Sequence, residues 1–197
     1  EGDESHGSFT NALHRLRRLL GDDEVLKLQD GKLSLDLDRC WIDALAMDSD
    51  GKISAGIPVA IATNEHGELD ARTDRILNLY RGHFLPQDLD APWAVPMRER
   101  LRGIFERHVL ELGCQLDAVG AHESAAKLYR RALEIEALNE TFYIQLMRSL
   151  SFVGAYAEAM QIYRRCRETL SIVLGIPPSA KTQALFEQIK ENARKNS

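Results

Sequence analysis

Two stretches decide the fold, GAHESAAKLYRRAL beginning at Gly120 and GAYAEAMQIYRRCR beginning at Gly154. The second follows the first by 34 residues, and at that offset a glycine, two alanines, a tyrosine and a pair of arginines coincide. The matched positions are Gly120 and Gly154, Ala121 and Ala155, Ala125 and Ala159, Tyr129 and Tyr163, and Arg130-Arg131 and Arg164-Arg165. A fixed period of this kind predicts two copies of one structural unit.

The period and the residue types resemble the tetratricopeptide repeat, a helix–turn–helix unit of about 34 residues. Glycine suits the reversal between the two helices, because it adopts a left-handed backbone without strain. A small alanine lets the second helix approach the first closely, and a large tyrosine fills the space toward the next helix. The repeat therefore predicts a stack of helical pairs in the C-terminal half of the chain.

Apolar residues at three- and four-residue spacing predict the helices of this stack. Pro96 suits a first helical turn, Asn139 is a suitable N-cap, and Gly175 ends a helix. The predicted helices are 96–119, 122–136, 139–152 and 156–174, with a closing helix at 179–192. A helical stack needs such a closing element, because its last face is otherwise uncovered.

The N-terminal segment SFTNALHRLRRLLG, beginning at Ser8, has the pattern of a basic amphipathic helix that Ser8 caps. One face carries Phe9, Leu13, Leu16 and Leu20, and the segment up to Leu20 contains no acidic residue. Two runs of alternating leucines follow on either side of Asp30-Gly31, which predicts a β-hairpin with a two-residue turn. Since a lone hairpin is marginal in water, its leucines should pack on the helix.

A basic helix followed directly by a hairpin has the layout of the last part of a winged helix-turn-helix. With DRCWIDA, LYRGHFLP, DAPWAVPMRERL and the repeats, the chain resembles the bacterial transcriptional activator domain behind an OmpR-like winged helix. Regulators of this kind include the Streptomyces antibiotic regulatory proteins and larger MalT-like activators. The resemblance covers nearly the whole chain, and implies DNA binding by the winged helix and protein contact by the repeats.

We therefore predict a mostly α protein, a tetratricopeptide-like domain preceded by the recognition helix and wing hairpin of a winged helix. The predicted domains are a partial winged helix at 1–38, a helical linker region at 39–95 and the repeats with their closing helix at 96–197. Residues 48–70 are interpreted as a loop or short hairpin. The start EGDESHGSFT lacks Met and the earlier helices of a winged domain, so we expect a piece of a longer protein.

The residues predicted to contact DNA lie on the polar side of the basic helix and beside the hairpin turn. They are Asn11, His14, Arg15, Arg18 and Lys32. Arginine pairs with guanine or holds phosphate, and asparagine reads adenine. Which of them face bases stays open, because phosphate contacts outnumber base contacts. The alternative is a solvated helix face that never touches DNA.

The first helix of each repeat is expected to line a concave groove that binds a peptide or a partner helix. By repeat position, the groove residues are Arg107, Asp117, Thr141, Arg148 and Ser151. The implied partner is RNA polymerase or a second copy of the regulator, which would give a homodimer. The alternatives are a groove too short to bind anything, and a scaffold or ligand-sensing module that does not bind DNA.

Other function classes find no support in the sequence. The net charge is −5, so any DNA contact must come from a local basic patch. Cys40, Cys114 and Cys166 form no ligand pair, and the run Asp48-Ser49-Asp50-Gly51 lacks the first ligand and the closing Glu of a calcium loop. With no apolar run near the ~20 residues of a membrane span and no catalytic motif, we predict a cytoplasmic protein without enzyme activity, metal or cofactor.

Overall fold

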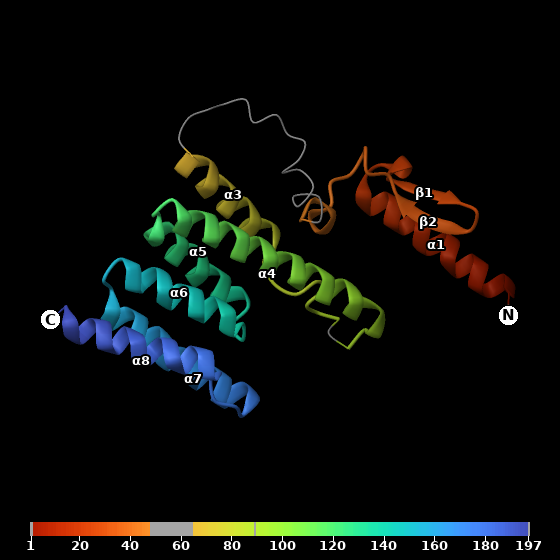
Figure 1. The fold of residues 1–197 in the computed structure, drawn as a ribbon. Helices are drawn as coiled ribbons and strands as arrows, with labels where there is room; N and C mark the ends of the chain where they lie inside the picture. Colours follow the sequence, from red (N-terminus) through yellow and green to blue (C-terminus); the bar gives the residue numbers. More distant parts are fainter. Residues whose placement is uncertain (1, 48–64, 89, 197) are drawn as a thin grey trace. The chain divides into compact units, whose positions relative to one another are not determined.

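The computed structural model describes residues 2–47, 65–88 and 90–196. It contains two compact units, Glu1–Ala46 and Met47–Ser197, which are described separately below as the first and second unit. Most of the described residues are helical (Figure 1), which confirms the predicted mostly α class. Within these ranges, the structure shows no helix whose length and apolar character would suit it to crossing a membrane.

The first unit consists of a helix and a hairpin. Its elements are α1 (Gly2–Leu20), the 3-10 turn η1 (Asp23–Val25), β1 (Leu26–Gln29) and β2 (Lys32–Leu35). The strands pair antiparallel, with Gln29 opposite Lys32. Asp30 and Gly31 have φ values of 51° and 75°, the left-handed pair that a type I′ turn requires. The predicted hairpin around Asp30-Gly31 is therefore confirmed.

The start of α1 differs from the prediction. The helix begins at Gly2, so Ser8 lies inside it and does not cap it. Serine is tolerated within a helix at a small cost in free energy, so a serine alone does not fix where a helix begins. The helix ends at Leu20, where Gly21 has φ 75° and donates its amide to the Arg17 carbonyl at 3.1 Å.

The first unit leaves much apolar surface uncovered. Leu13, Val25 and Leu26 are buried, and α1 packs on η1 at the base of the hairpin. Many other apolar side chains of this unit are exposed: Phe9, Leu16, Leu19, Leu20, Leu28, Leu33, Leu35 and Leu37. The expectation that the leucines of the hairpin pack on the helix is therefore wrong except for Leu26, because α1 meets only the base of the hairpin.

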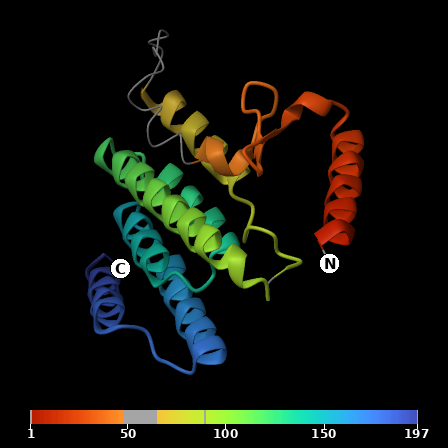
Figure 2. The ribbon, with the colours of Figure 1, turned by 90° about the vertical axis from the view of Figure 1, so that its right-hand side faces the viewer.

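The second unit is a stack of helices. Its elements are α3 (Glu65–Leu79), the 3-10 turn η2 (Pro92–Ala94), α4 (Val95–Ala118), α5 (His122–Ile135), α6 (Glu140–Phe152), α7 (Tyr156–Leu174) and α8 (Ala180–Lys195). Each helix from α3 to α7 packs on the one that follows it (Figures 1 and 2). The two predicted repeats are α4 with α5 and α6 with α7, and α8 closes the stack.

The two repeat turns have the same geometry. Gly120 and Gly154 are both left-handed, with φ values of 78° and 77°. In each turn the alanine after the glycine donates its amide to a leucine carbonyl at the end of the first helix. These bonds are Ala121 to Leu116 and Ala155 to Leu150, both 2.9 Å long. The 34-residue period seen in the sequence is thus a repeat in the structure.

The interpretation of residues 48–70 as a loop or short hairpin is wrong at its C-terminal end. Residues 65–70 are helical, because they form the first turns of α3. Residues 48–64, which include the calcium-like run Asp48 to Gly51, lie outside the described residues. The buried apolar side chains of α3, Ile76 and Leu77, fall within one turn, so a helical period was difficult to recognise.

The segment between α3 and α4 is held by an arginine. Arg98 of α4 donates from Nε to the Phe84 carbonyl at 2.8 Å and from Nη2 to the Leu85 carbonyl at 3.2 Å. Leu85 has a positive φ of 50°, which a tied backbone can maintain. This contact explains why the stretches LYRGHFLP and DAPWAVPMRERL belong together: the second supplies the side chain that fixes the first.

The repeats differ where their tyrosines pack. Tyr129 of α5 lies across Gly113 of α4, so closely that a Cβ added to the glycine would lie 2.0 Å from the Tyr129 hydroxyl oxygen. In the second repeat the equivalent position, 34 residues later, is occupied by Met147 and not by a glycine. Correspondingly, Tyr163 is only half-buried and stacks on Phe186 of α8, with 4.1 Å between ring centroids. The sequence comparison missed Gly113 because the second repeat does not share it.

Replacing Gly113 by alanine is expected to lower the free energy of unfolding of the second unit by about 1–3 kcal/mol, the usual cost of overpacking a filled site. Gly103→Ala is the matched control, because Gly103 lies in the same helix and a Cβ there meets nothing within 4 Å. The control should gain up to about 1 kcal/mol from helix propensity. Urea unfolding followed by circular dichroism measures both, and equal effects would contradict the packing described.

Candidate nucleic-acid interface and repeat groove

Helix α1 presents faces of different character. Leu13 is buried and Arg17, one turn later, is half-buried, so this side faces the hairpin. Leu16 and Leu19 form an exposed apolar side. By helical spacing, the side away from Leu13 carries four of the residues predicted to contact DNA, and all four are exposed: Asn11, His14, Arg15 and Arg18. The structure therefore gathers these four on one accessible face.

Arg17 joins α1 to the hairpin. Its Nη2 donates to the carbonyl of Leu26, the first residue of β1, at 3.1 Å. Its Nε is buried without a hydrogen-bond partner in the part of the chain that the structure describes. The side chain is thus directed toward the protein, whereas its neighbours Arg15 and Arg18 are exposed.

The base of the hairpin is closed by charged side chains. Arg39 pairs with Asp22 at 3.2 Å and with Glu24, and Lys27 Nζ lies 2.7 Å from Asp36 Oδ2. The hydrogen bond from Lys27 lowers the pKa of Asp36 below its ordinary value, against a smaller opposing effect of desolvation. These contacts fix the strands at the end opposite the turn.

The fifth predicted DNA contact, Lys32, lies at the turn end of the hairpin. It is exposed and begins β2, directly after Gly31. The sharp turn therefore presents a single positive side chain at the tip, where a wing would meet the DNA backbone.

The predicted groove residues fall into two groups. Arg107, Thr141 and Arg148 are exposed on α4 and α6, and Ser151 is half-buried near the end of α6. Asp117 is also half-buried, but it bonds within the protein. Repeat position alone therefore does not show whether the Asp117 side chain faces a partner.

Asp117 connects the two repeats. Its Oδ1 lies 2.8 Å from His122 Nδ1 on α5, and the hydroxyl of Ser149 on α6 donates to both carboxylate oxygens at 3.2 Å. The His122 ring stacks on Phe152, with 4.6 Å between centroids. Because the serine bonds the carboxylate and not the imidazole, these residues do not form a nucleophile and base. Their role is structural.

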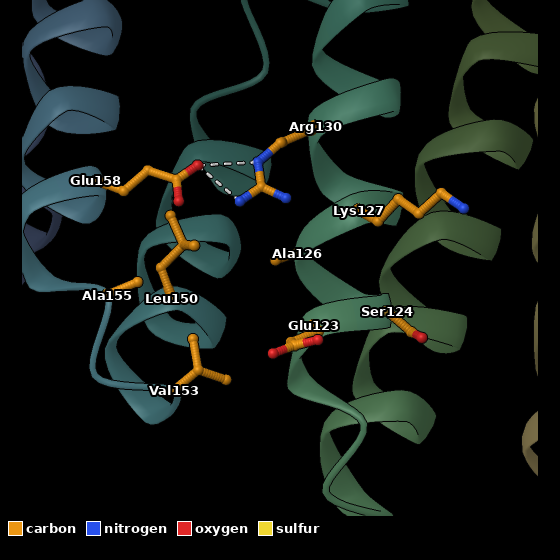
Figure 3. A pocket seen from close by; sticks show the side chains of 9 residues that line it. All are labelled: Glu123, Ser124, Ala126, Lys127, Arg130, Leu150, Val153, Ala155 and Glu158. Atoms are coloured by element: carbon orange, nitrogen blue, oxygen red, sulfur yellow. Dashed lines mark hydrogen bonds and ion pairs between the residues drawn. The ribbon is translucent and has the colours of Figure 1, made fainter.

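The repeats also form an open hollow of about 500 Å³ between α5 and the turn from α6 to α7 (Figure 3). The five predicted groove residues do not line it. Two acidic and two basic side chains do, and Arg130 donates from Nε and Nη2 to Glu158 Oε1 at 3.2 and 2.7 Å. The sequence did not indicate this hollow, since its two sides come from different repeats.

Comparison with known proteins supports one family. A model described as the bacterial transcriptional activator domain matches residues 58–190. Among solved structures, Mycobacterium tuberculosis EmbR in complex with a low-affinity phosphopeptide has a similar fold, with a TM-score of 0.60 at 21% identity over 97% of this chain and 52% of the EmbR chain. This chain thus spans about half the length of EmbR. No curated protein matches the sequence.

Replacing Asp36 by asparagine is expected to lower the hydrogen-exchange protection of the hairpin amides at pH 7. The same change should have little effect on that protection in acid. Since Lys27 lowers the pKa of folded Asp36 below the ordinary 3.8, the pair stabilises the hairpin above that pH. This stabilisation is lost as the pH falls through the lowered value. Hydrogen-exchange protection of the hairpin amides tests this, with Asp38→Asn as the exposed control. Protection that is equal in wild type and Asp36→Asn at pH 7 would contradict it.

Proposed function

The chain belongs to the bacterial transcriptional activator domain family, and from this premise we propose that it binds DNA through its first unit and another protein through its repeats. The family is one of transcription regulators and not of enzymes. One observation carries the proposal for DNA: the exposed polar residues of α1 share a face, while its contacts with the hairpin use another. Such a regulator would act in the cytoplasm, where bacterial DNA lies.

The mechanism is recognition without chemistry on a substrate. Helix α1 enters the major groove, where Arg15 and Arg18 hold guanine or phosphate and Asn11 reads adenine. The hairpin lies over the neighbouring backbone, with Lys32 toward a phosphate. The whole chain is acidic, but α1 carries no acidic residue between Ser8 and Leu20, so its field is locally positive.

The exposed apolar surface of the first unit supports a condition on this binding. Leu16 and Leu19 of α1 are exposed, the latter 84%. In a complete winged helix, earlier helices would cover such a surface and hold α1 in place. We therefore propose that DNA binding requires helices in addition to those described here.

Changing Arg15 and Arg18 together to alanine is expected to weaken DNA binding at least about tenfold and to flatten its salt dependence. The log–log slope should fall by about 0.9 for each phosphate that the variant no longer neutralises. Fluorescence anisotropy on promoter fragments over a salt series measures this, using the complete gene product with any residues encoded before Glu1. Circular dichroism checks that the repeats stay folded.

The matched control is Arg164→Ala with Arg165→Ala, which removes the same charge from exposed positions on α7. This pair should leave affinity and slope unchanged. If the wild type does not bind DNA, or if the α1 variant binds as well as the control, the DNA-binding proposal is wrong. A repeat scaffold without DNA contact would then be the better interpretation.

For the repeats, we propose protein contact along the exposed side of α4 and α6. Arg107 and Arg148 give this side positive charge, which suits an acidic surface on RNA polymerase or on a second copy. Dimerisation would position two DNA-binding units on one site, and polymerase contact would recruit the enzyme. Asp117 is less suited to such contact, because His122 and Ser149 already engage it.

Reversing the charge of Arg107 and Arg148 to glutamate is expected to weaken self-association or polymerase binding by about tenfold, since like charges would then face each other. Sedimentation velocity and a two-hybrid assay against polymerase subunits measure the two cases. Arg164→Glu with Arg165→Glu is the control. The groove is not the contact surface if the control weakens binding equally. A melting temperature of the repeats that rises when a ligand is added would instead favour a module that senses that ligand.

A further inference from the structure

We infer that Arg17 is a positioning residue, which sets the hairpin against α1 so that Lys32 reaches the DNA backbone, and that it does not contact DNA itself. The inference rests on the proposed DNA-binding function and deepens it. It separates Arg17 from Arg15 and Arg18, which stand beside it in the sequence and carry the same charge.

The first argument is the direction of the side chain. Arg17 lies one turn after the buried Leu13, on the side of α1 that faces the hairpin. Its Nη2 holds the Leu26 carbonyl at 3.1 Å, and its Nε is enclosed by protein. A guanidinium held in this way cannot also reach a phosphate beside Arg15, because the two side chains leave the helix on opposite sides.

The second argument is the place of the bond. Leu26 is the buried first residue of β1, so Arg17 attaches the helix to the base of the strand. Lys32 lies at the far end of the hairpin, past the turn after Gln29. The strand between is about 10 Å long at the usual rise per residue. A small rotation at Leu26 is therefore enlarged at the lysine.

The third argument is the second attachment on the other side of the hairpin base. Arg39 binds Asp22 and Glu24, which ties the chain after β2 to the turn before β1. This clasp closes the hairpin on itself but does not extend to α1. Arg17 and the packing of α1 on η1, with Leu13, Val25 and Leu26 buried, supply the attachment to the helix, and the Arg17 hydrogen bond has a defined direction.

The test uses Arg17→Met, which keeps an apolar stem, and Arg17→Lys, which keeps the charge but not the guanidinium geometry. In the DNA assay above, both should weaken binding about as much as Lys32→Ala and reduce the salt slope by about 0.9, the value for one phosphate. Adding Lys32→Ala to either variant should weaken DNA binding no further. Adding Arg15→Ala should weaken it by the product of the fold-changes of the two single substitutions.

In the DNA assay, two results overturn the inference. One is recovery of wild-type affinity in Arg17→Lys, which would mean that Arg17 acts through its charge. The other is multiplication of the effects of Arg17→Met and Lys32→Ala, which would mean that the two residues contact DNA independently.

A second measurement needs no DNA. Hydrogen exchange of β1 and β2 amides in this chain should be at least about tenfold faster in Arg17→Met than in wild type or Arg15→Ala, with the repeats unchanged. Unchanged exchange overturns the inference whether or not DNA binds. Faster exchange in a protein whose wild type fails to bind DNA would sink the proposed function and the DNA part of the inference together, while the attachment itself would stand.

Discussion

The helical stack depends on the close approach of α5 to α4, where the Tyr129 ring lies against Gly113. This approach brings the aromatic side chains of neighbouring helices into one core. Phe142 of α6 lies 6.4 Å from Tyr129 and 6.2 Å from Phe105 of α4, between ring centroids, and Tyr80 stacks on Phe105 at 4.5 Å. Aromatic contacts thus connect α5, α6, α4 and the residue that follows α3, and the absence of a side chain at Gly113 makes room for the Tyr129 ring in this core.

Polar contacts extend this packing toward both ends of the stack. At one end, the hydroxyl of Tyr80, whose ring belongs to the aromatic centre, donates to Glu136 at 2.8 Å. At the other, the Glu140 carboxylate of α6 accepts from the Ser179 amide at 2.7 Å and from the Thr182 hydroxyl, which ties down the start of α8. Burial alone would raise the pKa of Glu140, but these hydrogen bonds lower it. The carboxylate therefore stays charged and useful as a cap.

Sequence patterns predicted what depends on neighbouring residues and missed what depends on distant ones. The Asp30-Gly31 turn and the glycine turns at 120 and 154 could be predicted from the sequence, because local backbone geometry selects those residue types. Repeat position could place Asp117 near the end of α4, but it could not show that Ser149, 32 residues away, engages its carboxylate. In α1, spacing separated a polar face from an apolar one, yet it could not show that Arg17 turns inward, since three arginines in four positions look alike.

The proposed contact with DNA requires positive side chains that neighbouring carboxylates do not neutralise. In the repeats, the doubled arginine of the first copy is engaged internally, because Arg130 pairs with Glu158 and Arg131 with Asp74 at 3.1 Å. In the hairpin, Arg39 is likewise taken up by carboxylates. Helix α1 differs in composition, since it lacks acidic residues from Ser8 onward. The net charge of −5 therefore describes the surface as a whole and says little about the one face that would meet phosphate.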